Sequence, residues 1–424
     1  MIRIDELMPP LLAALSIGMV AVMALGLLRR GIRLVLDGEL AEPETLPGEF
    51  PVSSLSRREV LLVVALALAV RVGVALLGYL MYRLNGGKEG LLASFEGIWL
   101  HWDARHYLGI ARQWYTNMGN ERLRLVFFPF YPMLMRGLSR LTGMDPFAAG
   151  TLLSWGFSAG AAVALYDLVK SLRDRNLAAA AVGLFLLCPF SIFMGLVYTE
   201  ALFLLLTLLC MCLLMRGHPW AAALCGMLSA FTRTPGVIVA GLFLVRLLRE
   251  ICGRRRPGIM VSFLVQALMV FAGLAAYWLL NVLVTGDPFT YLTYQKENWY
   301  QEAGTFWNSV ENTVNYFMDS AGETDHWFTW GSQLVVILLT LLLMMFRLPH
   351  LPFDLAAWSL VYALVVVSPT WLLSAPRYLY AMATWPLMLG DVLGTGKRYT
   401  AAVALFSLLL VVWVYGYMIV IEVY

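Results

Sequence analysis

Long apolar runs recur along this chain and are separated by short charged loops. A helix needs about 20 predominantly apolar residues to cross the roughly 30 Å of hydrocarbon in a bilayer. About ten runs meet or approach that length, and they cover residues 9–28, 60–82, 147–169, 177–197, 199–215, 259–284, 333–346, 352–373, 377–393 and 400–421. Apolar residues make up 60% of the chain and charged residues 13%, whereas soluble domains are nearer half and a quarter. The sequence therefore predicts an all-α, polytopic membrane protein.

The charge distribution argues against several classes of function. The formal net charge is +3, and the basic residues are spread over short loops, so no nucleic-acid partner is predicted and membrane lipids are the expected surroundings. The sequence contains no GxxxxGK[ST] phosphate loop, no HExxH, no Cys/His zinc cluster and no DxD pair in its long outer loops. We therefore predict no cofactor and no metal site, and leave open whether a divalent ion assists.

The basic loops predict how the chain is threaded. The run at 9–28 is not a cleavable signal peptide, because acidic residues precede it and arginines close it, so we expect an anchor helix with its N-terminus outside. The segment 219–250 is interrupted by TRTPG at 232–236, where proline disfavours a continuous helix. If this segment returns to the side it came from, every later basic loop is cytoplasmic. We therefore predict a re-entrant hairpin of two half-helices.

This threading divides the chain into three parts. Residues 1–58 form the anchor helix and a cytoplasmic linker, 59–393 the core, and 394–424 a C-terminal membrane helix. The core has two large extracytoplasmic loops, 83–146 and 285–332, which are rich in aromatic residues. Loops of this size favour an enzyme acting on lipid-linked substrates over a simple pore. We predict a multi-pass protein of a bacterial cell membrane, or of the endoplasmic reticulum membrane if the source is eukaryotic.

The first outer loop has the densest ionisable chemistry, in the string HWDARHY at 101–107. On a helix, Asp103, His106 and Tyr107 share one face and can converge on a substrate. Asp103 is the candidate catalytic carboxylate. An alternative stays open, in which Asp103 only caps the helix that follows and Trp102 is an interfacial belt residue.

Two further features of the outer side are candidates for substrate contact. In FFPFYP at 127–132, the prolines stiffen the loop, and Phe128, Phe130 and Tyr131 are candidates for stacking on a sugar or an isoprenoid. A plain interfacial anchor is the alternative. Glu200 can bind acceptor hydroxyls or assist the catalytic carboxylate, or it can simply favour the N-terminus of the next helix.

Arginines within apolar segments predict an anion site. An arginine at the centre of a membrane helix costs about 2.5 to 3.5 kcal/mol, so Arg233 should face a partner or a wet cavity. It also precedes the start of a new half-helix, and a lipid phosphate is the natural anion for that position. Arg71 and Arg377 are placed similarly. The alternative is that any of the three is neutralised in a structural ion pair, with the carboxylate of Asp167, Asp391 or Glu200.

The string HWDARHYLGIA followed by FFPFYP resembles the first luminal loop of the PIG-V family, GPI mannosyltransferase II, where a WDA and an FFP motif occur in the same order. Further agreement comes from ALYDL at 164–168, GLVYTEALFLLLTL at 195–208, FTRTPG at 231–236 and SAPRYLYAMATWP at 374–386. The similarity spans roughly residues 60 to 390 and leaves the first and last helices uncovered.

The resemblance implies a GT-C fold and an enzyme that transfers mannose from polyprenyl-phosphate-mannose, with inversion, to a hydroxyl of a glycolipid or other glycan acceptor on the outer side. Asp103 is then the general base, and the donor phosphate is expected at Arg233 with Arg377 or Arg105. The other expected substrate contacts are Trp102, His106, Tyr107, Phe128, Tyr131, Glu200 and Tyr378. A transporter or flippase of lipid-linked glycan is the first alternative. A protein O-mannosyltransferase is the second, and the missing acidic pair in the first outer loop disfavours it.

Overall fold

Helices connected by short turns make up the fold. The structure, a computed structural model, describes residues 4–37, 55–252, 257–323 and 326–419. Within these ranges the only extended pairing is one isolated bridge. The prediction of an all-α, multi-pass membrane protein is confirmed.

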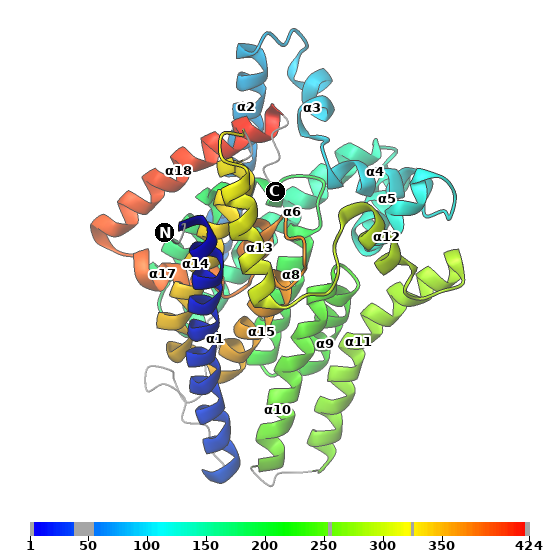
Figure 1. Ribbon diagram of the computed structural model, residues 1–424. Coiled ribbons are helices and arrows are strands. Elements are labelled where there is room, and N and C mark those ends of the chain that lie inside the picture. The colour runs from blue at the N-terminus through cyan, green and yellow to red at the C-terminus, as the bar shows by residue number, and fades with distance from the viewer. Residues whose placement is uncertain (1–3, 38–54, 253–256, 324–325, 420–424) are drawn as a thin grey trace.

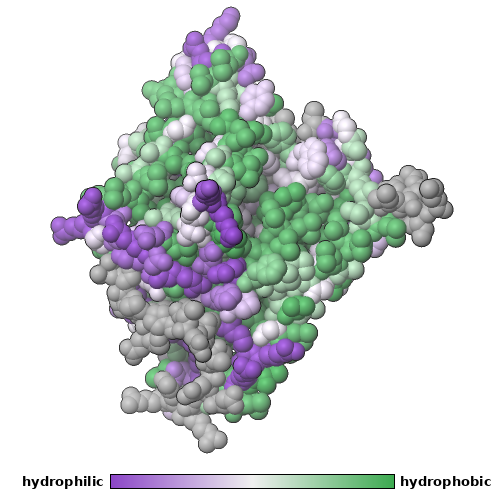
Figure 2. All heavy atoms as spheres, turned by 90° about the vertical axis from the view of Figure 1, so that its left-hand side faces the viewer, coloured by the Kyte–Doolittle hydropathy of each residue, from purple (hydrophilic) through white to green (hydrophobic). Residues whose placement is uncertain are grey.

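Six helices in the described part of the chain are long and apolar enough to cross a membrane. They are α1 (Ile4–Asp37), α2 (Arg57–Leu84), α6 (Pro146–Leu172), α11 (Pro257–Thr285), α14 (Ser332–Arg347) together with the π turn η4 (His326–Gly331) before it, and α18 (Gly396–Met418). Most residues of α1 and α2 are exposed on the surface of the chain, which leaves apolar faces for lipid. Figure 2 shows such a broad apolar surface, with hydrophilic residues at its top and in a band across its middle.

The remaining apolar runs are shorter helices, so the expectation of about ten full spans needs correction. The run at 177–197 is α7 (Arg175–Leu187) followed by the 3-10 turn η2 (Pro189–Met194), because Pro189 ends the helix. The run at 377–393 is likewise divided between α16 (Ala375–Tyr380) and α17 (Trp385–Leu393). Two more short apolar helices are α8 (Glu200–Met215) and α15 (Phe353–Val367).

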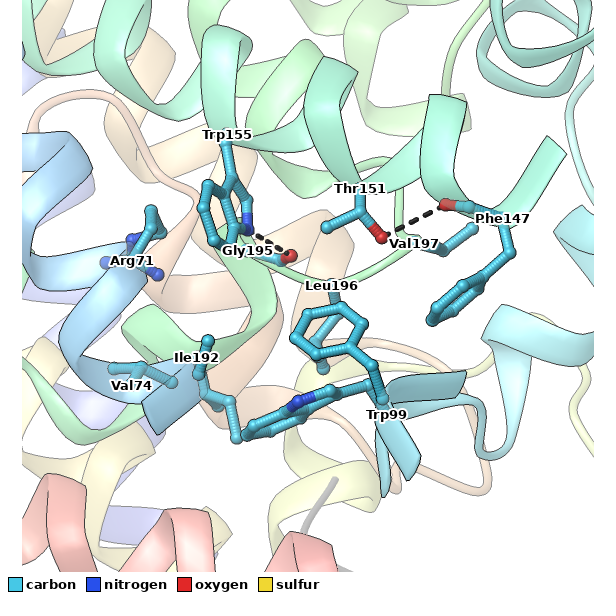
Figure 3. Close-up of a pocket in the computed structure, with 12 residues that line it drawn as sticks. Arg71, Val74, Trp99, Phe147, Thr151, Trp155, Ile192, Gly195, Leu196 and Val197 are labelled. Atoms are coloured by element: carbon cyan, nitrogen blue, oxygen red, sulfur yellow. Dashed lines mark hydrogen bonds between the residues drawn. The ribbon is translucent and has the colours of Figure 1, made fainter. Parts of the chain in front are cut away.

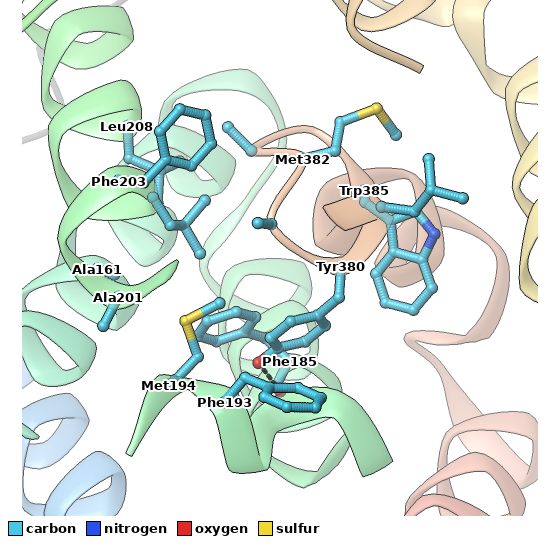
Figure 4. Packing of buried hydrophobic residues seen from close by; sticks show 14 of the residues in the cluster. Ala161, Phe185, Phe193, Met194, Ala201, Phe203, Leu208, Tyr380, Met382 and Trp385 are labelled. Atoms are coloured by element: carbon cyan, nitrogen blue, oxygen red, sulfur yellow. Dashed lines mark hydrogen bonds between the residues drawn. The ribbon is translucent and has the colours of Figure 1, made fainter. Parts of the chain in front are cut away.

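These short helices form the core rather than a lipid-facing wall. Figure 4 shows Phe185 of α7 packed beside Phe193 and Met194 of η2, with Tyr380 of α16 stacked on it. The rings of Phe185 and Tyr380 lie 5.0 Å apart and nearly parallel, and the Tyr380 hydroxyl donates to the Phe185 carbonyl at 2.8 Å. Hydropathy overestimated the number of spans because a segment buried in protein is as apolar as one that faces lipid.

The broken segment is a hairpin. It consists of α9 (Pro219–Ala230), the 3-10 turn η3 (Thr234–Val239) and α10 (Ala240–Cys252). A Cβ at Gly236 would lie 2.3 Å from the backbone carbonyl of Ser229, so η3 is pressed against the end of α9 where only glycine fits.

Ion pairs place both ends of the hairpin on one side of the molecule. Arg216, just before α9, pairs with Asp167 near the end of α6. Arg246 of α10 lies 3.8 Å from Asp354 at the start of α15. The described part of the hairpin therefore enters and leaves at the same end, as its charge pattern predicted (Figure 1).

The outer loops fold into short helices at the opposite end. The first loop contains α3 (Leu91–Trp99), α4 (Asp103–Gln113), the 3-10 turn η1 (Asn120–Val126) and α5 (Phe130–Thr142), and the second contains α12 (Thr290–Trp299) and α13 (Phe306–Asp319). The two loops meet, because the Tyr294 hydroxyl donates to the Asn117 side chain at 2.7 Å (Figure 1). The division of the chain at 58 and 393 stays a prediction, and residues 38–54 of the proposed linker lie outside the described residues.

Candidate active site

Four ionisable side chains from four distant parts of the chain meet beneath the outer loops. Arg377 of α16 forms ion pairs with two carboxylates: its Nη1 lies 2.8 Å from Asp103 Oδ2, and its Nε lies 3.0 Å from Glu200 Oε1. Arg233, in the turn between α9 and η3, pairs with the same Glu200 oxygen. We call Asp103, Glu200, Arg233 and Arg377 the charge network.

The charge network is buried at its base and open at Asp103. Glu200 is 1% exposed and Arg377 5% exposed, whereas 21% of the Asp103 side chain remains accessible. Two carboxylates balance two guanidinium groups, as burial requires, because an unpaired ion in a protein interior costs several kcal/mol. The geometry therefore leaves one carboxylate partly accessible, with cations directly behind it.

Aromatic rings enclose the two arginines. The guanidinium carbon of Arg233 lies 4.7 Å from the ring centroid of Tyr378, and that of Arg377 lies 5.1 Å from the same ring. Arg377 also lies 5.1 Å from the centroid of Tyr198. These cation–π contacts give weakly hydrated guanidinium groups an apolar but favourable environment. Tyr378 therefore lies against both arginines of the charge network, and Tyr198 is a further neighbour that the sequence did not single out.

Local backbone structure aims both carboxylates at Arg377. Asp103 is the first residue of α4, and the N-cap position belongs to Trp102, which makes no side-chain capping bond. The alternative that Asp103 only caps its helix is therefore wrong. Glu200 begins α8, where its charge also meets the positive end of the helix dipole.

His106 and Tyr107 occupy different surroundings. The Tyr107 hydroxyl lies 3.3 Å from that of Thr199, next to Glu200. His106 instead stacks on Phe127 at 4.5 Å and meets the edge of Trp299 from the second outer loop at 5.8 Å. Burial lowers the pKa of His106 below its ordinary value, and nearby Asp103 partly opposes the shift.

The structure places three other predicted residues away from the charge network. Arg105 is exposed and donates to the Leu100 carbonyl at 3.1 Å. Phe128 stacks on Tyr277 of α11 at 3.9 Å, in a small separate cluster. Tyr131 is fully buried, and its hydroxyl lies 2.7 Å from that of Ser154. Neither ring presents an open face for stacking on a substrate.

Arg71 contacts η2, the turn that precedes Glu200 in the chain. It is 1% exposed, and it donates to the Ser191 carbonyl in η2. Figure 3 shows it at the end of a small cavity lined by Thr151, Trp155 and other largely apolar side chains, with the Trp155 indole donating to the Gly195 carbonyl at 3.2 Å. Arg71 therefore donates to backbone carbonyl groups around the end of α7. It is separate from the charge network.

The ion-pair alternative for the arginines is correct for two of the three. Glu200 neutralises Arg233 and Arg377. The other two carboxylates considered pair at the opposite end of the molecule: Asp167 with Arg216, and Asp391 with Arg173 and Arg347.

Comparison with known proteins finds a family model described as Mannosyltransferase (PIG-V) that matches residues 89–311. The chain is 31% identical over 263 residues to GPI alpha-1,6-mannosyltransferase 2 of Cricetulus griseus, a match that covers 58% of this chain and 50% of the relative. The human protein of the same name is 29% identical over 264 residues, with 58% and 50% covered. The chain thus spans about half the length of the curated relatives it matches.

Among solved structures, the chain is similar to the crystal structure of an oligosaccharyltransferase from Archaeoglobus fulgidus in complex with Zn and sulfate. The TM-score is 0.42 at 14% identity, and the match covers 84% of this chain and 53% of that one. Within the charge network, Asp103, Glu200 and Arg233 lie inside the range of the family match, and Arg377 lies beyond it.

Proposed function

This chain belongs to the PIG-V mannosyltransferase family, and we propose that it transfers mannose from polyprenyl-phosphate-mannose to a hydroxyl of a glycolipid or other glycan acceptor. The reaction takes place on the outer side of the membrane, on a GT-C architecture. The observation that carries the proposal is the charge network, in which an accessible Asp103 is held 2.8 Å from a buried arginine. Such a site offers a base and a cationic cradle in the same place.

Asp103 is the general base of this reaction. The acceptor oxygen forms a bond to the anomeric carbon of mannose while the bond from that carbon to the phosphate oxygen breaks. Asp103 takes the hydroxyl proton, and the departing phosphate takes the bonding electrons. Because attack and departure occur on opposite faces, the configuration inverts. A positioned base typically contributes about 10²- to 10⁴-fold to such a step.

Arg233 and Arg377 hold the donor phosphate. Their charges are balanced by carboxylates in the structure, so a phosphate binds by exchange with a carboxylate. Arg377 has five N–H donors, and a phosphate accepts from such a fork as well as a carboxylate does. When the phosphate replaces Asp103 on Arg377, the aspartate is released toward the acceptor. Binding of the donor thereby prepares the base.

Substitution of Asp103 by asparagine tests the proposal. In purified protein supplied with polyprenyl-phosphate-mannose and a glycolipid acceptor, Asp103→Asn should lower transfer by about 100-fold or more, because the amide cannot accept the proton. Asp319→Asn, at the exposed end of α13, is the matched control and should keep full activity. Full turnover by folded Asp103→Asn would refute the base assignment.

A further inference from the structure

The last helix of the described chain reaches the loop that carries Asp103. α18 lies beyond residues 89–311, the range of the family match. Figure 1 shows its C-terminal end next to α2 and α3 rather than at the base of the molecule. Trp413, Val414 and Tyr417 of this end are buried.

Tyr417 contacts three of the residues that precede Asp103. It is fully buried, and its hydroxyl donates to the Trp99 carbonyl at 3.1 Å. Its ring centroid lies 5.5 Å from that of His101 and 4.8 Å from that of Trp102, with the Trp102 ring nearly perpendicular to it. One side chain of α18 therefore packs against both the backbone and the rings of residues 99–102.

Trp102 needs such support because its backbone is in an unfavourable region. Its φ of 46° and ψ of −122° are those of a turn position that glycine normally occupies. A bulky residue keeps such a conformation only when its surroundings over-determine it. The peptide that follows Trp102 starts α4, so this conformation sets where the Asp103 carboxylate points.

We infer that Tyr417 is a positioning residue for Asp103. By holding Trp102 in its left-handed conformation, Tyr417 fixes the first turn of α4. In that turn the Ala104 amide donates to the His101 carbonyl at 3.1 Å, and the Arg105 amide donates to the Trp102 carbonyl at 3.1 Å. That turn keeps Asp103 within 2.8 Å of Arg377. The inference rests on the proposed function of Asp103, and it gives Tyr417 a part in catalysis without contact to the reacting atoms.

The test compares two substitutions at Tyr417 with one at Trp413. Tyr417→Leu should lower kcat about tenfold or more and leave KM for both substrates nearly unchanged, because a base misplaced by about 1 Å can lose 10²-fold in rate. Tyr417→Phe keeps the ring and should recover most of the activity. Trp413→Leu removes a buried ring of the same helix that packs on Phe190 and Phe328. It should lower the thermal midpoint similarly without lowering kcat.

A double-mutant cycle tests the route through Trp102. Glycine adopts positive φ without steric cost, so in a Trp102→Gly background the loss of kcat caused by Tyr417→Leu should shrink to less than threefold. An undiminished loss in that background would overturn the inference, as would equal kcat losses in Tyr417→Leu and Trp413→Leu.

Hydrogen exchange separates this inference from the proposed function. In a peptide spanning residues 98–108, the Ala104 and Arg105 amides should exchange at least tenfold faster in Tyr417→Leu than in wild type or Trp413→Leu. Unchanged exchange would overturn the positioning role whatever the activity. Faster exchange together with full turnover of Asp103→Asn would support the role of Tyr417 in the loop and refute Asp103 as the base.

Discussion

At the scale of single residues, Glu200 decides whether the two buried arginines can coexist. Its Oε1 accepts a hydrogen bond from Arg233 and forms an ion pair with Arg377, and Glu200 is almost wholly inaccessible. Removing this carboxylate leaves two guanidinium groups with Asp103 as the remaining anion of the charge network. The structure therefore makes Glu200 a bridge between the arginines, which was one of the alternatives beside a helix start, a substrate contact and assistance to Asp103.

Glu200→Gln should destabilise the protein by roughly 3 to 5 kcal/mol, because breaking a buried ion pair leaves an uncompensated charge. The measurement is denaturant or thermal unfolding of the purified protein in detergent. Glu297→Gln removes an exposed carboxylate 4.0 Å from Arg122, and its cost should stay below about 1 kcal/mol. Equal stability of the two variants would contradict the bridging role.

His106 makes stability depend on pH. Burial lowers its pKa in the folded state below the ordinary value of 6.5, so the unfolded chain binds the proton more readily. The stability that neutral His106 contributes is complete above pH 6.5 and is lost as the pH falls below it. Thermal midpoints measured between pH 8 and 5 should fall less for His106→Asn than for wild type. Some fall should persist in the variant, because burial lowers the pKa of His101 as well.

The sequence supplied the members of the site but not their contacts. Glu200 and Arg233 stood out because an ionisable group in an apolar segment needs a partner, and Asp103 stood out because it lies in the densest ionisable string of the first outer loop. That they meet at Arg377 depends on how α4, α8, α16 and the hairpin pack, and no spacing along the chain encodes this. Tyr417 gave no signal at all, because a tyrosine near the end of a membrane helix is typical of any interfacial anchor.

At the scale of elements, the proline and glycine of the TRTPG turn predicted the break between α9 and α10 correctly. Because proline and glycine act locally through the backbone, their effect can be predicted from the sequence. The runs at 177–197 and 377–393 were predicted as continuous spans and are broken instead. Burial in the protein core and exposure to lipid select the same apolar residues, so composition alone does not distinguish them.

Gly236→Ala tests how the hairpin positions Arg233. The added Cβ would lie 2.3 Å from the Ser229 backbone, which cannot move as a side chain does, so η3 must move away from the end of α9 and shift Arg233 between them. We expect a loss of about 1 to 3 kcal/mol in stability and a raised KM for the donor. Gly241→Ala in α10 meets nothing within 4 Å and should be neutral or slightly stabilising. A donor KM unchanged by Gly236→Ala would show that the tight turn does not position the arginine.

At the scale of the whole molecule, the described charges divide between two ends. Arg173 and Arg347 pair with Asp391 at one end, where Arg30 also donates to the Leu351 carbonyl at 3.1 Å. The charge network and the aromatic loops lie toward the other end. Because basic loops stay in the cytoplasm, this polarity supports the proposal that Asp103 faces the outer side.

Cysteine labelling in intact cells tests this orientation and the hairpin together. His218 and Gly258 flank the hairpin and are exposed, so cysteines at both positions should stay unlabelled by a membrane-impermeant maleimide until the cells are opened. A cysteine at Asp319 should react in intact cells, since α13 belongs to the outer loops. Labelling is measured above that of the parent chain, whose cysteines are buried or half-buried where described.

If only one of positions 218 and 258 reacts from outside, the segment crosses the membrane, and the loops on its two sides face opposite compartments. Because the later basic loops would then lie outside, that result would also remove the charge argument that places Asp103 there.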